Sequence, residues 1–314
     1  MRTAFIRTLV DLARNDGRIF LLVGDLGYTV VEPFAEEFPD RFVNVGVAEQ
    51  NLTGIATGLA LCDKVVFTYS IGNFPTLRCL EQIRNDACFH NANVKVVAVG
   101  GGLCYGPLGM THHATEDLAM LRSLPGMTVI APGDPVEAAL ATQAVAKRSG
   151  PCYLRLAKAG DPIVHQEVPD FRVGEAIRVR DGGDLTLIAI GGMLHSAVEA
   201  AEELGLLGVS ARVLSMHTLK PLDVEAVQRA AHETAAVITL EEHSIIGGLG
   251  SAVAEALAAG NSAVAFRRMG IGDSFCHQAG SHDYLRRLHS LTVPQIVEEA
   301  LRLTVGRETV RVSG

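Results

Sequence analysis

A single carboxylate, Glu49, precedes a stretch of small and apolar residues that runs to Leu61. Within this stretch Ile55, Ala56 and Leu59 recur at helical spacing, which predicts a buried helix with Glu49 in its first turn. A carboxylate in that position can complement the positive end of the helix dipole. It can also hydrogen-bond a ligand or move a proton. Position alone favours the first interpretation.

A second acidic residue, Asp25, follows the strand predicted at residues 19–23. Glu49 likewise follows the next predicted strand, at residues 43–47. The carboxyl ends of parallel strands meet at one edge of a sheet, where α/β proteins bind their ligands. The two carboxylates are therefore predicted to share that edge, although Asp25 can also simply cap its turn.

The segment at residues 100–113 is rich in glycine and ends in His112 and His113, just before a helix predicted to start near residue 115. A long loop inside a compact domain often carries function. The two histidines have no further ligands at a spacing that suits a metal ion. Capping or hydrogen bonding within the loop therefore stays open beside a role in catalysis.

Strands and helices alternate along the chain, which predicts an α/β protein with two doubly wound, mainly parallel sheets. The alternation breaks at residues 161–183, where prolines and charges gather. We predict a first domain at 1–165, a linker at 166–183 and a smaller second domain at 184–314. The predicted strands are 19–23, 43–47, 64–69, 93–99, 128–131, 151–156, 185–190, 211–216, 235–240 and 264–269. The predicted helices include 3–15, 49–61, 75–89, 193–207, 222–233, 248–259 and 293–303.

The composition excludes several classes of function. The net charge of −8 over 314 residues argues against a nucleic-acid surface. No apolar run reaches the roughly 18–20 residues that a membrane span needs, and the amphipathic N-terminus lacks a signal-peptide core. The six cysteines show no metal-ligand spacing, so reduced core thiols in a cytoplasmic protein are expected.

Several short motifs together resemble one enzyme family. The segments GDLG at 24–27, NVGVAEQNLTGIATGLAL at 44–61, EQIRND at 81–86 and GMTHHATEDLAMLRSLPGMTVIAPGDPVEA at 109–138 resemble the pyrimidine-binding domain of transketolases. The segments ITLEEHS at 238–244 and GGLGSAVAEAL at 247–257 resemble the transketolase C-terminal domain. The resemblance covers essentially the whole chain, and its motifs are specific in combination.

The resemblance changes the interpretation of Glu49. In this family the matching glutamate hydrogen-bonds the aminopyrimidine ring of thiamine diphosphate and favours the imino tautomer of its amine. The imine then removes a proton from the thiazolium carbon, and the carbanion attacks a ketose carbonyl. The resemblance therefore implies that Glu49 is catalytic, as is His112, which matches a histidine at the substrate end of the cavity.

Other site residues are implied in the same way. Where the family has a further aromatic wall, this chain has Ile71. Lys158 replaces an arginine of the family, which keeps the charge but loses the planar two-pronged geometry. The implied cofactor-binding residues are Asp25, Glu49, Gln50, Tyr69 (with Phe67 as an alternative) and Phe74, and the implied substrate-binding residues are Arg2, Thr29, His112 and Lys158.

Two departures from the family concern recognition of the donor substrate. Gly100 stands where typical transketolases have a histidine, and Leu108 stands where they have an acidic residue that reads the hydroxyls of the donor. An unusual ketose or ketose phosphate is therefore expected as the substrate.

The family binds the diphosphate through a divalent cation held by a GDG motif and a later asparagine, and GDG occurs nowhere in this sequence. The resemblance therefore implies the C-terminal subunit of a split transketolase. An N-terminal subunit would carry the GDG motif and the Mg²⁺ or Ca²⁺ ion, and thiamine diphosphate would bind between the subunits. An α2β2 heterotetramer is the natural expectation.

Three alternatives stay open. The beta chain of a 2-oxo acid dehydrogenase decarboxylating component has the same layout and glutamate, although the 109–125 segment looks more like transketolase. A deoxyxylulose phosphate synthase-like carboligase also has a Thr-His pair in this loop. A non-catalytic paralogue is disfavoured because Asp25, Glu49, Phe74 and His112 are all retained.

Overall fold

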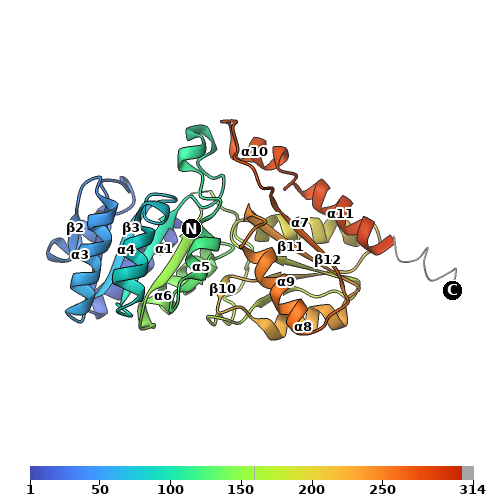
Figure 1. Ribbon diagram of the computed structural model, residues 1–314, viewed down its shortest axis with the longest axis horizontal. Helices are drawn as coiled ribbons and strands as arrows, with labels where there is room; N and C mark the ends of the chain where they lie inside the picture. The colour runs from blue at the N-terminus through green and yellow to red at the C-terminus, as the bar shows by residue number, and fades with distance from the viewer. Residues whose placement is uncertain (159, 306–314) are drawn as a thin grey trace.

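The structure is a computed structural model that describes residues 1–158 and 160–305. Two α/β units lie side by side, one coloured blue to green and the other yellow to red (Figure 1). Each unit is a mostly parallel sheet with helices packed against it, and this confirms the predicted fold class.

The first sheet has seven strands in the order β10-β5-β6-β4-β3-β1-β2. All neighbouring strands are parallel except β10, which pairs antiparallel with β5. The central strand β4 is buried along its whole length, and its valine-rich run is typical of a parallel strand covered on both faces. The strands are β1 (Ile19–Val23), β2 (Phe42–Asn44), β3 (Val65–Ile71), β4 (Val94–Val99), β5 (Thr128–Ile130), β6 (Cys152–Leu156) and β10 (Thr218–Lys220).

Helices cover both faces of this sheet. On one face α1 (Arg2–Asn15) packs against α6 (Pro135–Lys147), and their apolar stripes join one core cluster. On the other face lie α3 (Glu49–Leu61), α4 (Leu80–Gln82) and α5 (Asp117–Ser123). The buried residues of α3 and α5 belong to a second cluster, and Leu80 of α4 packs against it. The short helix α2 (Glu32–Glu37) follows β1. The sheet therefore presents its carboxyl edge to the start of α3.

The second sheet has the order β12-β11-β8-β9-β7 and is parallel except for the edge strand β7. The helices α7 and α11 contribute to a core cluster that also takes in Leu103 of the first unit, whereas α8 and α9 join a cluster shared with α3 and α5 of the first unit. The elements are β7 (Ile177–Arg180), β8 (Leu185–Ala189), α7 (Met193–Leu206), β9 (Ala211–Ser215), α8 (Val224–Glu233), β11 (Ala236–Ser244), α9 (Leu249–Ala259), β12 (Ala265–Ile271), α10 (His282–Leu288) and α11 (Val293–Val305).

Several elements differ from the sequence prediction. The strand predicted at 43–47 ends at Asn44, and the rest forms the turn into α3. The helix predicted at 75–89 is a 3-10 turn, one α-helical turn and a π-helix at Ile83–Cys88, whose wider turns break the spacing that a regular helix would keep. The strand β10 and the helices α2 and α10 were not predicted.

The strand β10 has a consequence for the architecture. Its residues lie in the second half of the sequence, yet the strand extends the first sheet, where Thr218 pairs with Ile130. Because its hydrogen-bonding partner is so distant along the chain, no local pattern could have revealed the pairing. The two units are therefore joined by backbone hydrogen bonds as well as by a shared core.

Two further sequence expectations concern location. All six cysteines are free, and Cys62 is the one on the surface. Among residues 1–158 and 160–305, no helix is both long enough and apolar enough to cross a bilayer. The cytoplasmic location stays a prediction.

Candidate active site

Glu49 is the first residue of α3, and its carboxylate lies at the carboxyl edge of the first sheet. The side chain is only 1% exposed, and Oε2 accepts a hydrogen bond from Nη1 of Arg78 at 2.7 Å. Oε1 receives no hydrogen bond from the residues that the structure describes. The helix N-terminus and the guanidinium both stabilise negative charge on Glu49. One carboxylate oxygen thus stays available to a ligand.

Arg78 joins Glu49 to two other candidate residues. Its guanidinium carbon lies 4.8 Å from the centroid of the Phe74 ring, within reach of a cation–π interaction. Its backbone carbonyl accepts a hydrogen bond from Nε2 of Gln50 at 3.3 Å. Sequence reasoning missed Arg78, which lies within a 3-10 turn at Leu77–Cys79 where a regular helix was predicted.

Beyond Arg78, the site consists of the rings of Phe74, His112 and Tyr105. The imidazole of His112 meets the Phe74 ring edge-on, with centroids 5.1 Å apart. The ring centroids of His112 and Tyr105 are 6.3 Å apart, and Nζ of Lys158 lies 5.0 Å from the centroid of the Tyr105 ring. Three residues predicted from separate segments, Phe74, His112 and Lys158, thus form one row with Tyr105.

Asp25 and Thr29 lie on the exposed turn that follows β1. Both adopt left-handed backbone conformations, with φ of +55° and +66°, which are uncommon for residues other than glycine. The Asn44 amide and the Tyr28 hydroxyl each donate a hydrogen bond of 3.0 Å to the Asp25 carboxylate, and they lower its pKa. The turn thereby holds an ionised carboxylate at the same sheet edge as Glu49.

The segment at residues 100–113 is anchored to the second unit. The backbone N–H of Leu103 donates to Oε1 of Glu242 at 2.6 Å, and Nη2 of Arg155 donates to the carbonyls of Ala114 and Glu242. Arg155 in turn pairs with the fully buried Asp117 at 2.7 Å. This network fixes the backbone from which His112 projects.

His113 differs from His112. It is 3% exposed, and neither ring nitrogen has a hydrogen-bond partner within the described parts of the chain. Burial lowers the pKa of His113, so the ring is neutral near pH 7. Its carbonyl accepts a hydrogen bond from the Asn73 amide. His113 therefore packs inside the protein, whereas His112 borders the row of aromatic rings.

Comparison with known proteins identifies the family. The family model for the transketolase pyrimidine-binding domain matches residues 1–160, and the model for the transketolase C-terminal domain matches residues 174–298. The chain belongs to the transketolase family. Membership of this family implies dependence on thiamine diphosphate.

Two transketolase relatives of similar length are described as subunits. The chain is 39% identical to the 6-deoxy-6-sulfo-D-fructose transketolase subunit SqwH of a Clostridium species over 305 residues, which cover 97% of this chain and 94% of the relative. It is 40% identical to an apulose-4-phosphate transketolase subunit of Phocaeicola vulgatus over 284 residues, covering 90% of each chain. A solved structure described as a split gene transketolase, inactive beta4 tetramer, superposes with a TM-score of 0.88 at 38% identity and covers 96% of this chain and 98% of its own.

The structure explains one departure from the usual transketolase pattern. Gly100 has φ of +82°, and a Cβ atom added there would lie 2.1 Å from the ring of Tyr105. Tyr105 therefore occupies the space that a histidine at position 100 would need. Leu108, the other departure, is 54% exposed at the end of a 3-10 turn. Sequence reasoning missed Tyr105. The available signal was Gly100, because a glycine in place of a larger residue leaves room for a neighbouring ring.

Two predicted residues of the transketolase site lie in different surroundings from Glu49. Tyr69 is 1% exposed and stacks on Phe5 with centroids 5.8 Å apart, in the core on the α1 face. Burial raises the pKa of both Tyr69 and Tyr105, and the nearby charge of Arg2 partly offsets this rise. The charge of Arg2 thus acts on both tyrosines, and Tyr69 supports the site from the core.

Residues in this chain fit one end of thiamine diphosphate. A buried carboxylate with a free oxygen suits a ring nitrogen that carries a proton, and the face of an aromatic side chain beside it suits a flat heterocycle. Glu49, the first residue of α3, supplies the carboxylate. Phe74, in the turn that follows β3, supplies the ring. Both residues were predicted from the sequence.

Proposed function

We propose that this chain is the C-terminal subunit of a split thiamine diphosphate-dependent transketolase. The enzyme moves a two-carbon ketol unit from a ketose or ketose phosphate donor to an aldose acceptor. The observation that carries the proposal is the 1%-exposed carboxylate of Glu49, which has one free oxygen and is linked through Arg78 to the ring of Phe74. Near-complete coverage of two transketolase subunits supports it.

Each residue has a defined task in this reaction. Glu49 hydrogen-bonds the ring nitrogen of the aminopyrimidine and holds or releases its proton, and Phe74 packs against the ring. Thiamine diphosphate, when bound, supplies the carbanion and the electron sink. His112, at the edge of Phe74, donates a hydrogen bond to the substrate oxygen on which negative charge develops.

The substrate is proposed to carry a negatively charged group. Lys158 lies near Tyr105, and the charge of Arg2 acts on the same tyrosine. Two positive charges suit a phosphate or a sulfonate. Asp25 and Thr29 line the rim, where sugar hydroxyls can bind. The names of two relatives, a sulfo-fructose transketolase subunit and an apulose-4-phosphate transketolase subunit, include such groups.

The proposed partner is an N-terminal subunit that carries the GDG motif and the Mg²⁺ or Ca²⁺ ion. Large apolar side chains stand exposed next to the candidate residues, namely Tyr28 at 69%, Val47 at 74% and Leu77 at 55%. Exposed apolar side chains that gather around a site mark an interaction surface. The partner would cover this surface in an α2β2 assembly, with the cofactor between the subunits.

The test is reconstitution of the pair. The chain and its N-terminal subunit are mixed with thiamine diphosphate and Mg²⁺, and ketol transfer from phosphorylated and sulfonated ketoses is measured beside release of CO₂ from 2-oxo acids. Ketol transfer by the pair, and none by the chain alone, is the expected result. Efficient release of CO₂ without ketol transfer would instead identify a decarboxylating component or a carboligase.

A further inference from the structure

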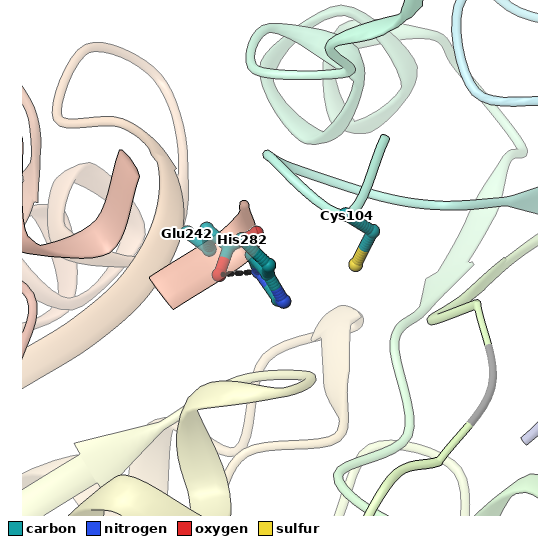
Figure 2. A group of neighbouring side chains, drawn as sticks. All are labelled: Cys104, Glu242 and His282. Carbon is teal, nitrogen blue, oxygen red and sulfur yellow. Dashed lines mark hydrogen bonds and ion pairs between the residues drawn. The ribbon is translucent and has the colours of Figure 1, made fainter. Parts of the chain in front are cut away.

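A cavity of about 330 Å³ lies between the two units, and neither Glu49 nor a member of the row of Phe74, His112, Tyr105 and Lys158 lines it. Three side chains of different chemistry converge on it: Cys104 from the 100–113 segment, Glu242 from β11, and His282 at the start of α10. Figure 2 shows the His282 ring against the Glu242 carboxylate and the thiol of Cys104 facing both. The cluster joins the two units.

The three groups are close enough to share one ion. A sulfur, a ring nitrogen and a carboxylate oxygen from these residues all lie within 4.8 Å of one another. In a tetrahedral zinc site, ligand atoms about 2.0–2.3 Å from the ion lie about 3.3–3.8 Å apart. Small rotations of the Cys104 and His282 side chains are therefore enough to close the site.

Glu242 is held in place for this role. Oε1 accepts the Leu103 N–H at 2.6 Å, and Oε2 accepts Nε of Arg286 at 2.5 Å. Nε2 of His282 lies 2.8 and 2.7 Å from the two carboxylate oxygens. These outer contacts orient the carboxylate in the way that partners of metal ligands do, and the hydrogen of Nε2 lies where an ion would bind.

We propose that Cys104, Glu242 and His282 form a site for a divalent transition-metal ion of borderline softness, with Zn²⁺ as the fitting probe. Thiolate, imidazole and carboxylate are the ligands that zinc prefers, and three protein ligands leave a fourth position open to the cavity. Hard cations such as Mg²⁺ bind all-oxygen sites instead. The site is separate from the divalent ion that the proposed partner subunit holds.

The charges around the cluster are compatible with an ion. Burial raises the pKa of the Cys104 thiol to about 12, so the thiol keeps its proton until an ion replaces it. One thiolate and one carboxylate then neutralise the two charges of Zn²⁺. Arg286 and Arg155 also line the cavity. Arg155 is already paired with Asp117, and Asp283, which lines the same cavity, offsets Arg286.

The ion would tie together parts of the chain that are far apart in the sequence. Cys104 lies on the segment that carries Tyr105 and His112, whereas Glu242 and His282 belong to the second unit. A bound ion would stabilise the contact between the two units, because it binds only the folded arrangement. This proposal is independent of the proposed transketolase reaction.

Binding is tested on the full chain without its partner. Equilibrium dialysis with metal analysis is expected to find one Zn²⁺ per chain, and Co²⁺ is expected to give the thiolate-to-cobalt charge-transfer band of a sulfur ligand. Cys104→Ser and His282→Asn should each abolish this band or weaken binding by about 100-fold or more, beyond the usual loss from an outer-shell partner. Two matched controls, Cys62→Ser and His90→Asn at exposed positions, should change neither.

Thermal unfolding separates loss of the ligand from loss of the fold. Without metal, Cys104→Ser and His282→Asn should both still unfold in one cooperative transition, and His282→Asn should do so at a somewhat lower temperature because its hydrogen bonds to Glu242 are lost. Added Zn²⁺ should raise the unfolding temperature of the unchanged chain and of the two controls only. The proposal is overturned by the absence of stoichiometric binding, by binding that survives both site substitutions, or by a cobalt band that depends on Cys62.

Discussion

Nη1 of Arg78 lies 2.7 Å from Oε2 of Glu49. The carboxylate is buried, whereas the arginine side chain is 47% exposed, so the charge of Glu49 is balanced by a group that can move into solvent. The same guanidinium lies over Phe74. Arg78 therefore occupies the place where a ligand of Glu49 and Phe74 would bind, and it must shift or share the carboxylate when one does.

The first prediction concerns this pair. Arg78→Leu leaves the buried carboxylate of Glu49 without its partner and should lower the free energy of unfolding by about 1–3 kcal/mol. Glu49→Gln in the same chain should restore about 1 kcal/mol or more of the loss, because no buried charge is then left unpaired. Urea unfolding of the two single variants and the double variant measures this coupling. If the losses of the two single variants add up to the loss of the double variant, the contact between Arg78 and Glu49 does not contribute to stability.

The second prediction concerns Phe74. Phe74→Ala removes the ring that borders both Arg78 and His112, and it should weaken binding of thiamine diphosphate to the assembled pair about tenfold, or about 1.4 kcal/mol. The matched control is Phe89→Ala, since Phe89 is 82% exposed. Titration of enzyme activity with the cofactor measures both. Equal effects of the two substitutions would contradict the assignment of Phe74.

The third prediction concerns the packing of Tyr105 on Gly100. Gly100→Ala should lower the free energy of unfolding clearly more than Gly208→Ala, because both glycines have positive φ (+82° and +83°) but only the Cβ at position 100 meets a ring. Left-handed strain alone costs about 1–2 kcal/mol, and the collision adds to it. Combining Gly100→Ala with Tyr105→Leu should recover part of the added loss. Similar unfolding free energies for the two alanine variants would show that Tyr105 moves away freely.

The fourth prediction concerns pH and the buried His217, which stacks on Phe171 with ring centroids 4.0 Å apart. Burial lowers the pKa of His217 to about 4. Between that pH and the ordinary value near 6.5, the unfolded chain binds the proton and the folded chain does not, so stability falls as the pH falls.

Between pH 7 and pH 5, the unfavourable protonation of His217 should lower the free energy of unfolding by about 2 kcal/mol. In His217→Gln the loss of unfolding free energy over this interval should be smaller by that amount, and urea unfolding at the two pH values checks it. An unchanged pH dependence would mean that His217 takes up its proton in the folded chain.

Much of the fold followed from local patterns. The buried valines of β4 and the apolar stripe of α1 are strong signals, because the spacing of apolar residues along a strand or a helix does not depend on distant parts of the chain. The breaks of the 75–89 segment into 3-10, α and π turns left no such signal. Neither did β10, whose pairing with β5 depends on residues far along the chain.

The candidate site was predictable only in part. Glu49, Phe74 and His112 lie in short motifs, and the structure brings Phe74 beside both His112 and the partner of Glu49. Arg78 and Tyr105 were missed because their positions depend on the turns that carry them. The cluster of Cys104, Glu242 and His282 has no sequence signature, since three distant segments supply its members.

The most direct measurement is ketol transfer by the reconstituted pair that contains Glu49→Gln. Glutamine keeps the shape of the side chain but cannot hold the proton, so kcat/KM should fall by about 10³-fold, a loss of about 4 kcal/mol of transition-state stabilisation. Glu81→Gln, an exposed glutamate nearby, serves as the control and should keep full activity. Turnover of the Glu49→Gln pair within a few-fold of the unchanged enzyme would contradict the account.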